Sequence, residues 1–198
     1  RRIIVALALL AALVQPSSAC AVPNFSFGVH DDGAAVFNRD NLRDETLKRA
    51  YAFGARVQRT ILYHDRSWHI YDRAIQRAHK RHLQVQMVIA CNGRRWTPQE
   101  YATYVRGVVR HFRSKVRRWS LCNEPNQPGW LVAMPGYDLP TTYRLLHQAG
   151  YSAIKQVQPK RSEVLFGELS SNYYPLEFMR RVVCDNGDLS GTCTQIQA

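Results

Sequence analysis

Hydrophobic and polar positions form two alternating patterns along the chain. Short, nearly continuous apolar runs, typical of strands buried in a parallel sheet, occur at residues 25–31, 55–63, 83–90, 116–123 and 162–170. Helical spacing of apolar residues predicts helices at 43–54, 68–82, 97–115, 140–159 and 175–184. Leu42, directly before the first of these ranges, and Leu47, Ala50 and Phe53 within it have this spacing. Strands that alternate with helices indicate βαβ units and a parallel sheet covered on both faces.

The spacing of the predicted strands favours one architecture over another. They begin near residues 25, 55, 83, 116 and 162, and a (β/α)8 TIM barrel needs about 250 residues. The sequence therefore predicts an α/β fold, a TIM barrel truncated after about its fifth βα unit. A doubly wound open sheet is the rival, but it usually carries a glycine-rich phosphate turn after its first strand. The segment GVHDDGAAV matches that turn poorly.

The first 21 residues have the pattern of a secretory signal peptide. Arg1 and Arg2 precede the apolar stretch IIVALALLAALV, and Ala19-Cys20-Ala21 offers small residues for cleavage. The apolar stretch is short for a membrane span, so none is expected. Lipidation of Cys20 is the less favoured alternative, because Ser17 stands where a lipoprotein signal usually has leucine. The protein is thus expected to be secreted or to lie in the cell envelope.

The strong positive charge does not by itself identify a partner. The formal net charge is +12, and loss of residues 1–21 would leave +10, since that segment holds two arginines and no acid. The arginines are scattered over what are predicted to be solvated helix faces, and no basic tract is interleaved with aromatic residues for base stacking. We expect no nucleic-acid partner.

The cysteines suit an exported protein, in which disulfides persist. Cys184 and Cys193 bracket the turn-rich segment DNGDLSGT and are candidates for a short disulfide. Cys91 and Cys122 have no metal-ligand spacing, and they either pair or remain buried thiols.

The segment WSLCNEPN places Asn123 and Glu124 where the fourth predicted strand ends. In a (β/α)8 barrel the carboxyl ends of the strands carry the chemistry. With Arg59 in VQRTILY on the second strand, this segment resembles the retaining glycoside hydrolases of clan A, the family 5 cellulase-like and family 39-like barrels. The resemblance implies that Glu124 is the general acid/base, that Asn123 hydrogen-bonds the sugar 2-hydroxyl, and that Arg59 supports the nucleophile.

The same resemblance implies a function for residues 22–198 as part of a catalytic domain. The expected reaction is hydrolysis of O-glycosidic bonds in a β-linked poly- or oligosaccharide by a retaining double displacement. No cofactor is expected, and the full-length protein is expected to be a monomer. Such enzymes use two carboxyl groups about 5–5.5 Å apart. In the clan the nucleophile ends the seventh strand, two strands beyond the fifth, so this chain alone is expected to be inactive. A non-catalytic carbohydrate-binding or envelope protein on the same barrel is the alternative, and an unrelated α/β enzyme is a third.

The remaining candidates are weaker. Glu168 in LFGELS is a residue of the cleft wall that supports the site, a structural acid, or the nucleophile. Trp96, Trp130, Asn126 and His30 follow predicted strands and are candidates for substrate contact. No group of residues supplies a consistent metal-ligand set, so we expect no metal.

Overall fold

The fold is a parallel sheet whose strands lie side by side in chain order. A computed structural model describes residues 26–184. The sheet order is β1-β2-β3-β4-β5, and every neighbouring pair is parallel. The strands are β1 (Gly28–His30), β2 (Val57–Leu62), β3 (Gln84–Ile89), β4 (Arg118–Leu121) and β5 (Glu163–Leu165). Sequential order is that of a (β/α)8 barrel, whereas a doubly wound sheet reverses its strand order, so the architecture predicted from strand spacing is confirmed.

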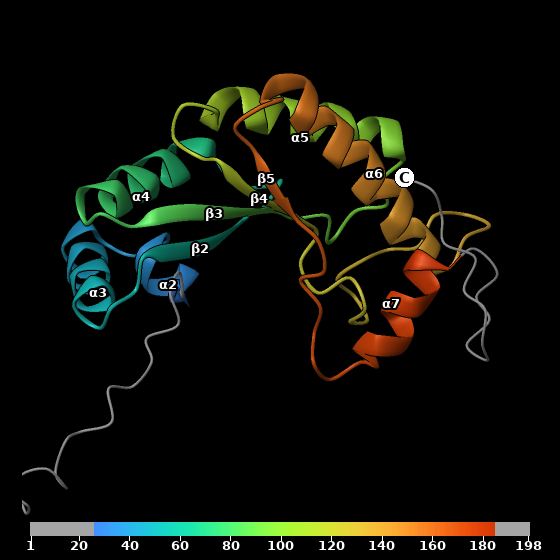
Figure 1. Cartoon of the computed structure of the whole chain (residues 1–198), viewed down its shortest axis with the longest axis horizontal. Helices are drawn as coiled ribbons and strands as arrows, with labels where there is room; N and C mark the ends of the chain where they lie inside the picture. The colour runs from blue at the N-terminus through green and yellow to red at the C-terminus, as the bar shows by residue number, and fades with distance from the viewer. Residues whose placement is uncertain (1–25, 185–198) are drawn as a thin grey trace, which may run out of the picture.

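Helices cover the outer side of this curved sheet. Figure 1 shows the strands as an arc with α3, α4, α5 and α6 along its convex side. The helices are α2 (Asp32–Ala35), α3 (Asp40–Ala52), α4 (Trp68–Lys80), α5 (Pro98–Phe112), α6 (Leu139–Val157) and α7 (Pro175–Val183). The five predicted helices are present within a few residues of their expected bounds, and the short α2 was not predicted. Among the described residues no helix is long and apolar enough to cross a membrane.

Local signals in the sequence explain where the long helices begin. Thr97 caps α5 in a reciprocal capping box, since its hydroxyl accepts from the Glu100 N–H and the Glu100 carboxylate accepts from the Thr97 N–H. Asp138 caps α6 by accepting from the Thr141 N–H at 2.9 Å. Proline follows each cap within two residues, where its missing N–H costs no helical hydrogen bond.

The core lies between the sheet and the helices. Alternate strand residues such as Trp119 and Leu121 are fully buried against α5 and α6. The indole N–H of Trp119 donates to the Gln158 side chain at 2.8 Å. Gly150 lets α6 approach β4 closely, because a Cβ there would lie 2.8 Å from Leu121 Cδ1.

Two expectations about packing were wrong. No long helix packs on the inner face of the described sheet, which carries polar side chains, among them Arg59, Gln86 and Ser120, beside a small buried apolar cluster of Ile61, Val88 and Ala90. In α3, only Leu47 and Ala50 of the expected apolar positions are buried, whereas Leu42 is 49% and Phe53 83% exposed. Leu42 lies in the first turn of α3, and Phe53 follows its last residue.

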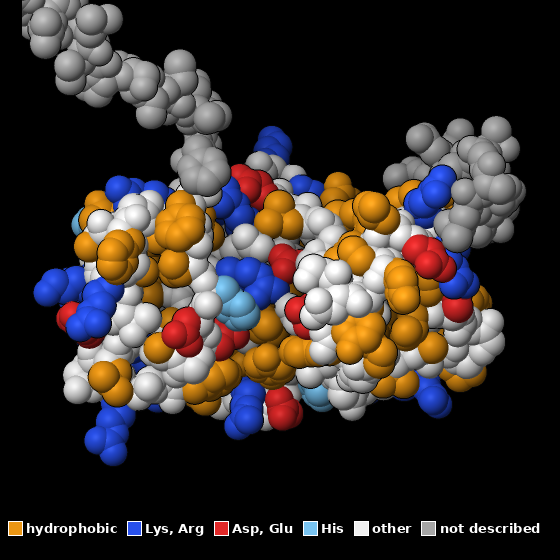
Figure 2. Space-filling model, turned by 90° about the horizontal axis from the view of Figure 1, so that it is seen from below, with side chains coloured by type: hydrophobic (Ala, Val, Ile, Leu, Met, Phe, Trp, Pro, Cys, Tyr) orange, Lys and Arg blue, Asp and Glu red, His pale blue; other side chains and the backbone are white. Residues whose placement is uncertain are grey.

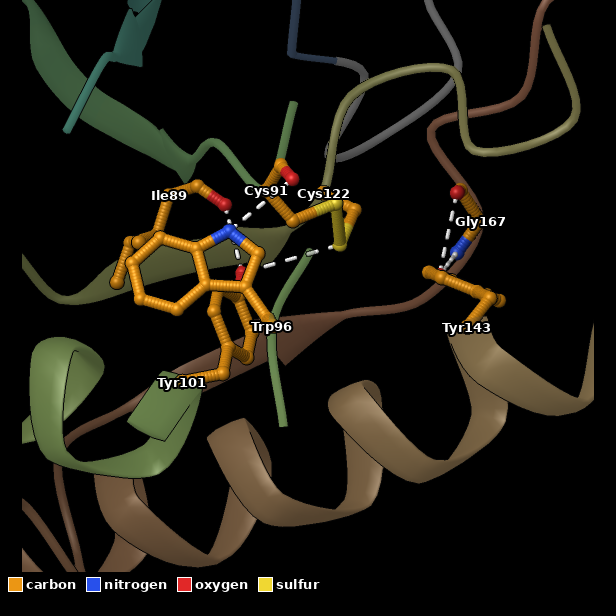
Figure 3. Close-up of a disulfide and its surroundings, with 7 residues drawn as sticks. All are labelled: Ile89, Cys91, Trp96, Tyr101, Cys122, Tyr143 and Gly167. Atoms are coloured by element: carbon orange, nitrogen blue, oxygen red, sulfur yellow. Dashed lines mark hydrogen bonds between the residues drawn. A yellow bond between two sulfur atoms is a disulfide. The ribbon is translucent and has the colours of Figure 1, made fainter. Parts of the chain in front are cut away.

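A disulfide joins the carboxyl ends of β3 and β4. Cys91 and Cys122, whose pairing the sequence left open, are bonded with their Cα atoms 4.9 Å apart. Figure 3 shows Trp96 and Tyr101 packed beside the disulfide. The Trp96 indole N–H donates to the Cys91 carbonyl at 3.1 Å, and the Tyr101 hydroxyl donates to the Ile89 carbonyl at 2.8 Å. The disulfide therefore fixes the strand end that leads into Asn123 and Glu124.

Removing this disulfide is expected to cost about 2–4 kcal/mol in the free energy of unfolding, because it closes a loop of intermediate length in the unfolded chain. The Cys91→Ala/Cys122→Ala variant should show this loss in urea unfolding. A reduced wild-type sample serves as the control, because it lacks the disulfide but keeps both cysteine side chains. An unchanged midpoint in both would show that the bond does not contribute to stability.

The expected signal peptide and Cys193 lie outside the described residues. The pairing of Cys184 with Cys193 and the segment boundary near residue 21 therefore stay predictions.

Candidate active site

The central feature of the inner face is an ion pair between Arg59 on β2 and Glu168, which follows β5. The Arg59 Nε and Nη2 atoms donate to one Glu168 carboxylate oxygen at 3.0 and 2.5 Å. Nη2 also donates to Asn123 Oδ1 at 2.6 Å. The Arg59 and Glu168 side chains are only 21% and 12% exposed. Arg59 thus links the segments that follow β4 and β5 to β2.

The second oxygen of Glu168 is held from β3. Gln86 Nε2 donates to it at 2.8 Å and also contacts the Ser120 hydroxyl of β4 at 3.2 Å. The carboxylate therefore accepts three N–H donors, two of them from the charged guanidinium. Residues of β2, β3 and β4 and the segment after β5 meet in this one network.

A histidine extends the network to β1. His30 Nδ1 lies 3.0 Å from Arg59 Nη1, and His30 Nε2 lies 3.3 Å from the Asp32 carboxylate. Arg59 Nη1 also lies 3.4 Å from His30 Nε2, so the guanidinium faces both ring nitrogens. Asp32 is itself fixed by the Thr60 hydroxyl and by the Ile61 N–H, at 2.7 and 3.0 Å.

Glu124 lies beside this network, and its carboxylate has different partners. Its backbone N–H donates to the Glu168 carbonyl at 2.7 Å, so the two residues are adjacent. Its carboxylate accepts from Gln127 Nε2 at 2.9 Å, in the amide orientation that also lets Gln127 Oε1 accept the Trp130 indole N–H at 2.9 Å. Trp130 is half-buried, and the Gln127 side chain links its indole to Glu124.

Left-handed backbone conformations cluster at these strand ends. Cys122, Glu124 and Glu168 have φ values of 59°, 45° and 57°, a region that costs non-glycine residues about 1–3 kcal/mol each. The disulfide and the bond between the Cys122 N–H and the Ile89 carbonyl hold the conformation of Cys122. The backbone bond between Glu124 and Glu168 holds that of Glu124. Strained residues of this kind collect at functional sites.

A buried tyrosine supports the segment that carries Glu168. The Tyr143 hydroxyl donates to the Gly167 carbonyl and accepts from its N–H, both at 3.2 Å (Figure 3). Burial raises the pKa of the Tyr143 phenol well above its ordinary value, against the opposing effect of the Gly167 bond, and the Glu168 charge raises it further. The neutral Tyr143 phenol therefore holds the backbone of Gly167, next to Glu168.

The face that carries these residues is concave. Figure 2 looks onto it and shows cationic, acidic and histidine side chains gathered in a hollow between more hydrophobic flanks. A cavity of about 260 Å³ in this region is lined by His30, Arg59 and Gln86, among others. No group of side chains that could hold a metal ion is found within residues 26–184.

The sequence candidates divide into two groups. Arg59, Asn123, Glu124, Glu168, His30 and Trp130 lie in or beside the network described above. Trp96 is 3% exposed, stacks on Tyr104 and carries the Arg94 guanidinium over its ring, so a sugar could stack on it only after rearrangement. Asn126 is 7% exposed, and its amide bonds to the backbone of Ser170 and Tyr173. In this structure Asn126 holds the segment after β5.

Four supporting residues were missed in the sequence: Asp32, Gln86, Gln127 and Tyr143. Gln86 carried a usable signal, because a polar residue in the otherwise apolar run LQVQMVIA must face something other than the core. Asp32, which follows the first strand in GVHDD, carried a similar one.

Comparisons with known proteins bear on the fold. No model of a known protein family matches the chain, and no curated protein matches it. Among solved structures, the exo-β-1,4-mannosidase Op5Man5 from Opitutaceae bacterium strain TAV5 superposes with a TM-score of 0.55 at 13% identity, over 82% of this chain and 33% of that one. Fpglu1 from Fervidobacterium pennivoraus gives 0.50 at 15% identity, over 75% and 50%. A family 1 β-glucosidase from Thermotoga maritima gives 0.47 at 13% identity, over 61% and 35%.

At these identities the likeness concerns the fold. The chain spans between a third and a half of the length of these structures. Its five consecutive βα units, in sequential parallel order, have the architecture of part of a (β/α)8 barrel, which its likeness to Op5Man5 supports.

Proposed function

We propose that this chain is part of an exported retaining β-glycoside hydrolase in which Glu124 is the general acid/base. The observation that carries the proposal is the convergence of Arg59, Asn123 and Glu124 at the carboxyl end of the sheet. Asn123 Oδ1 is taken by Arg59, and no described residue accepts from its Nδ2. The amide is thus oriented with a free donor, as binding of a sugar hydroxyl requires.

Glu168 is a positioning residue in this proposal and not the nucleophile. It follows β5, one βα unit after Glu124, whereas the resemblance to clan A places the nucleophile at the end of the seventh strand. Its carboxylate is held by three N–H donors from Arg59 and Gln86. The nucleophile then belongs to a later strand of the barrel. Arg59 can still approach it, because Nη1, which faces His30, has a second proton with no partner among residues 26–184.

Two features of the chain support export. The buried Cys91–Cys122 disulfide is of the kind that persists outside the cytosol. The first 21 residues have a signal-peptide pattern. Retention of the disulfide in protein recovered from the culture medium or periplasm would test this part of the proposal.

The function is tested with the full-length protein on β-linked glucans, mannans and xylans. We expect hydrolysis of at least one of them, with the product released first as the β-anomer, which proton NMR of the fresh reaction mixture detects. Initial release of the α-anomer would contradict the retaining mechanism. Binding of a polysaccharide without any hydrolysis would favour the carbohydrate-binding alternative.

A further inference from the structure

A cationic pocket lies at the amino-terminal ends of β3, β4 and β5, the end of the sheet opposite to Glu124. Its volume is about 780 Å³. Successive connections from helix to strand line it: His82 precedes β3, Lys115 and Arg117 precede β4, and Lys160 and Arg161 precede β5. The sheet topology thus gathers basic residues that are far apart in the sequence.

Most of the positive charge in this pocket is not neutralised. Arg118 pairs with Glu163 at 2.7 Å, and Lys115 pairs with Asp72 at 2.8 Å. Arg117, Lys160 and Arg161 are exposed, and no acid of the described part of the chain forms an ion pair with them. Glu163, already paired, is the one acid among the lining residues.

His79 also lines the pocket. Burial lowers the pKa of His79, and the nearby Lys115 ammonium lowers it further. The excess of cations over acids among the lining residues favours binding of an anion at this place.

We propose that this pocket binds a segment of an acidic polysaccharide, through the carboxylate, sulfate or phosphate groups of the glycan. The volume lies in the range of about 300–1,000 Å³ that is typical of sites for small ligands, so it admits a few sugar units and not a duplex. The lining residues include no Trp, Tyr or Phe on which the bases of a single-stranded nucleic acid could stack. A recessed pocket is also poorly placed to meet the flat surface of a membrane.

The inference does not depend on the proposed function, because the pocket shares no residue with the network around Arg59 and Glu124. A protein without hydrolase activity could still bind through it. The Glu124→Gln variant is therefore expected to bind acidic glycan as the wild type does.

The test is calorimetric titration of the full-length protein with a heparin hexasaccharide and with an oligogalacturonide. We expect binding of at least one of them that weakens as salt is raised, since exposed charges are screened. The Arg117→Gln/Lys160→Gln/Arg161→Gln variant should lose about tenfold or more in affinity, because charge-assisted hydrogen bonds to the anion disappear. A control with the same change in net charge, Arg66→Gln/Arg73→Gln/Arg95→Gln, alters exposed arginines elsewhere and should stay within about twofold.

Three outcomes would overturn the proposal. One is the absence of binding to both oligosaccharides. Another is an equal loss in the two triple variants, which would indicate a general effect of net charge. The third is equal or tighter binding, with the same dependence on Arg117, Lys160 and Arg161, to a short DNA duplex or to vesicles containing phosphatidylserine. Thermal melting of each variant checks that it is folded.

Discussion

Replacing Glu124 by glutamine is expected to lower kcat/KM of the full-length protein on an unactivated β-linked polysaccharide by about 10²–10⁴-fold, the usual contribution of a general acid. Glutamine keeps the shape of the side chain and its contact with Gln127, but it cannot deliver a proton to the leaving oxygen. The measurement is the initial rate on the polysaccharide that the wild type cleaves best.

A substrate with a better leaving group distinguishes loss of acid catalysis from general damage to the active site. The dinitrophenolate of a dinitrophenyl glycoside departs without protonation. The Glu124→Gln variant should therefore form the glycosyl-enzyme from this substrate with a far smaller loss of rate than it shows on the polysaccharide. Glu177→Gln is the matched control, because Glu177 is exposed on α7 and should behave as the wild type. Equal rates for the two variants on the polysaccharide would remove Glu124 from the mechanism.

The elements of the fold could be predicted because each one carries its own local signal. Apolar runs and helical spacing located the five strands, and Thr97-Pro98 located the start of α5. Leu42 and Phe53 were misjudged because periodicity says which face of a helix is apolar but not how far the sheet extends beneath it. The short α2 was missed because its four residues are too few to show a period.

The site could be predicted only in part, because its supporting contacts are long-range. Asn123 and Glu124 stand next to each other in the sequence, and their place at a strand end is a local feature. The bonds from Arg59 and Gln86 to Glu168 join residues that are 109 and 82 positions apart, and no local pattern encodes them. The sequence therefore left the role of Glu168 open, and the structure adds that its carboxylate is held by Arg59 and Gln86.

The pair formed by Arg59 and Glu168 should be the most costly polar interaction to disrupt. Glu168→Ala is expected to reduce the free energy of unfolding by about 3–5 kcal/mol, because it leaves a partly buried guanidinium without its counter-charge. Urea unfolding measures the loss. Arg59→Met alone should cost a similar amount, since it leaves the carboxylate with only Gln86 as a donor.

The double variant Arg59→Met/Glu168→Ala distinguishes an interaction between the two side chains from two separate effects. If they act as a pair, the double variant should be more stable than the sum of the single losses predicts, by about 1–3 kcal/mol. The matched control is the cycle for Glu45 and Arg49, an ion pair on α3 whose side chains are 46% and 71% exposed, for which a coupling of about 0.5 kcal/mol or less is expected. Strict additivity for Arg59 and Glu168 would mean that their contact does not hold the site together. A purely structural acid would leave KM and kcat of the folded Glu168→Gln variant unchanged. Coupling in the double variant, together with a raised KM and an altered kcat in Glu168→Gln, would instead show that the carboxylate acts on the substrate through Arg59 and Asn123.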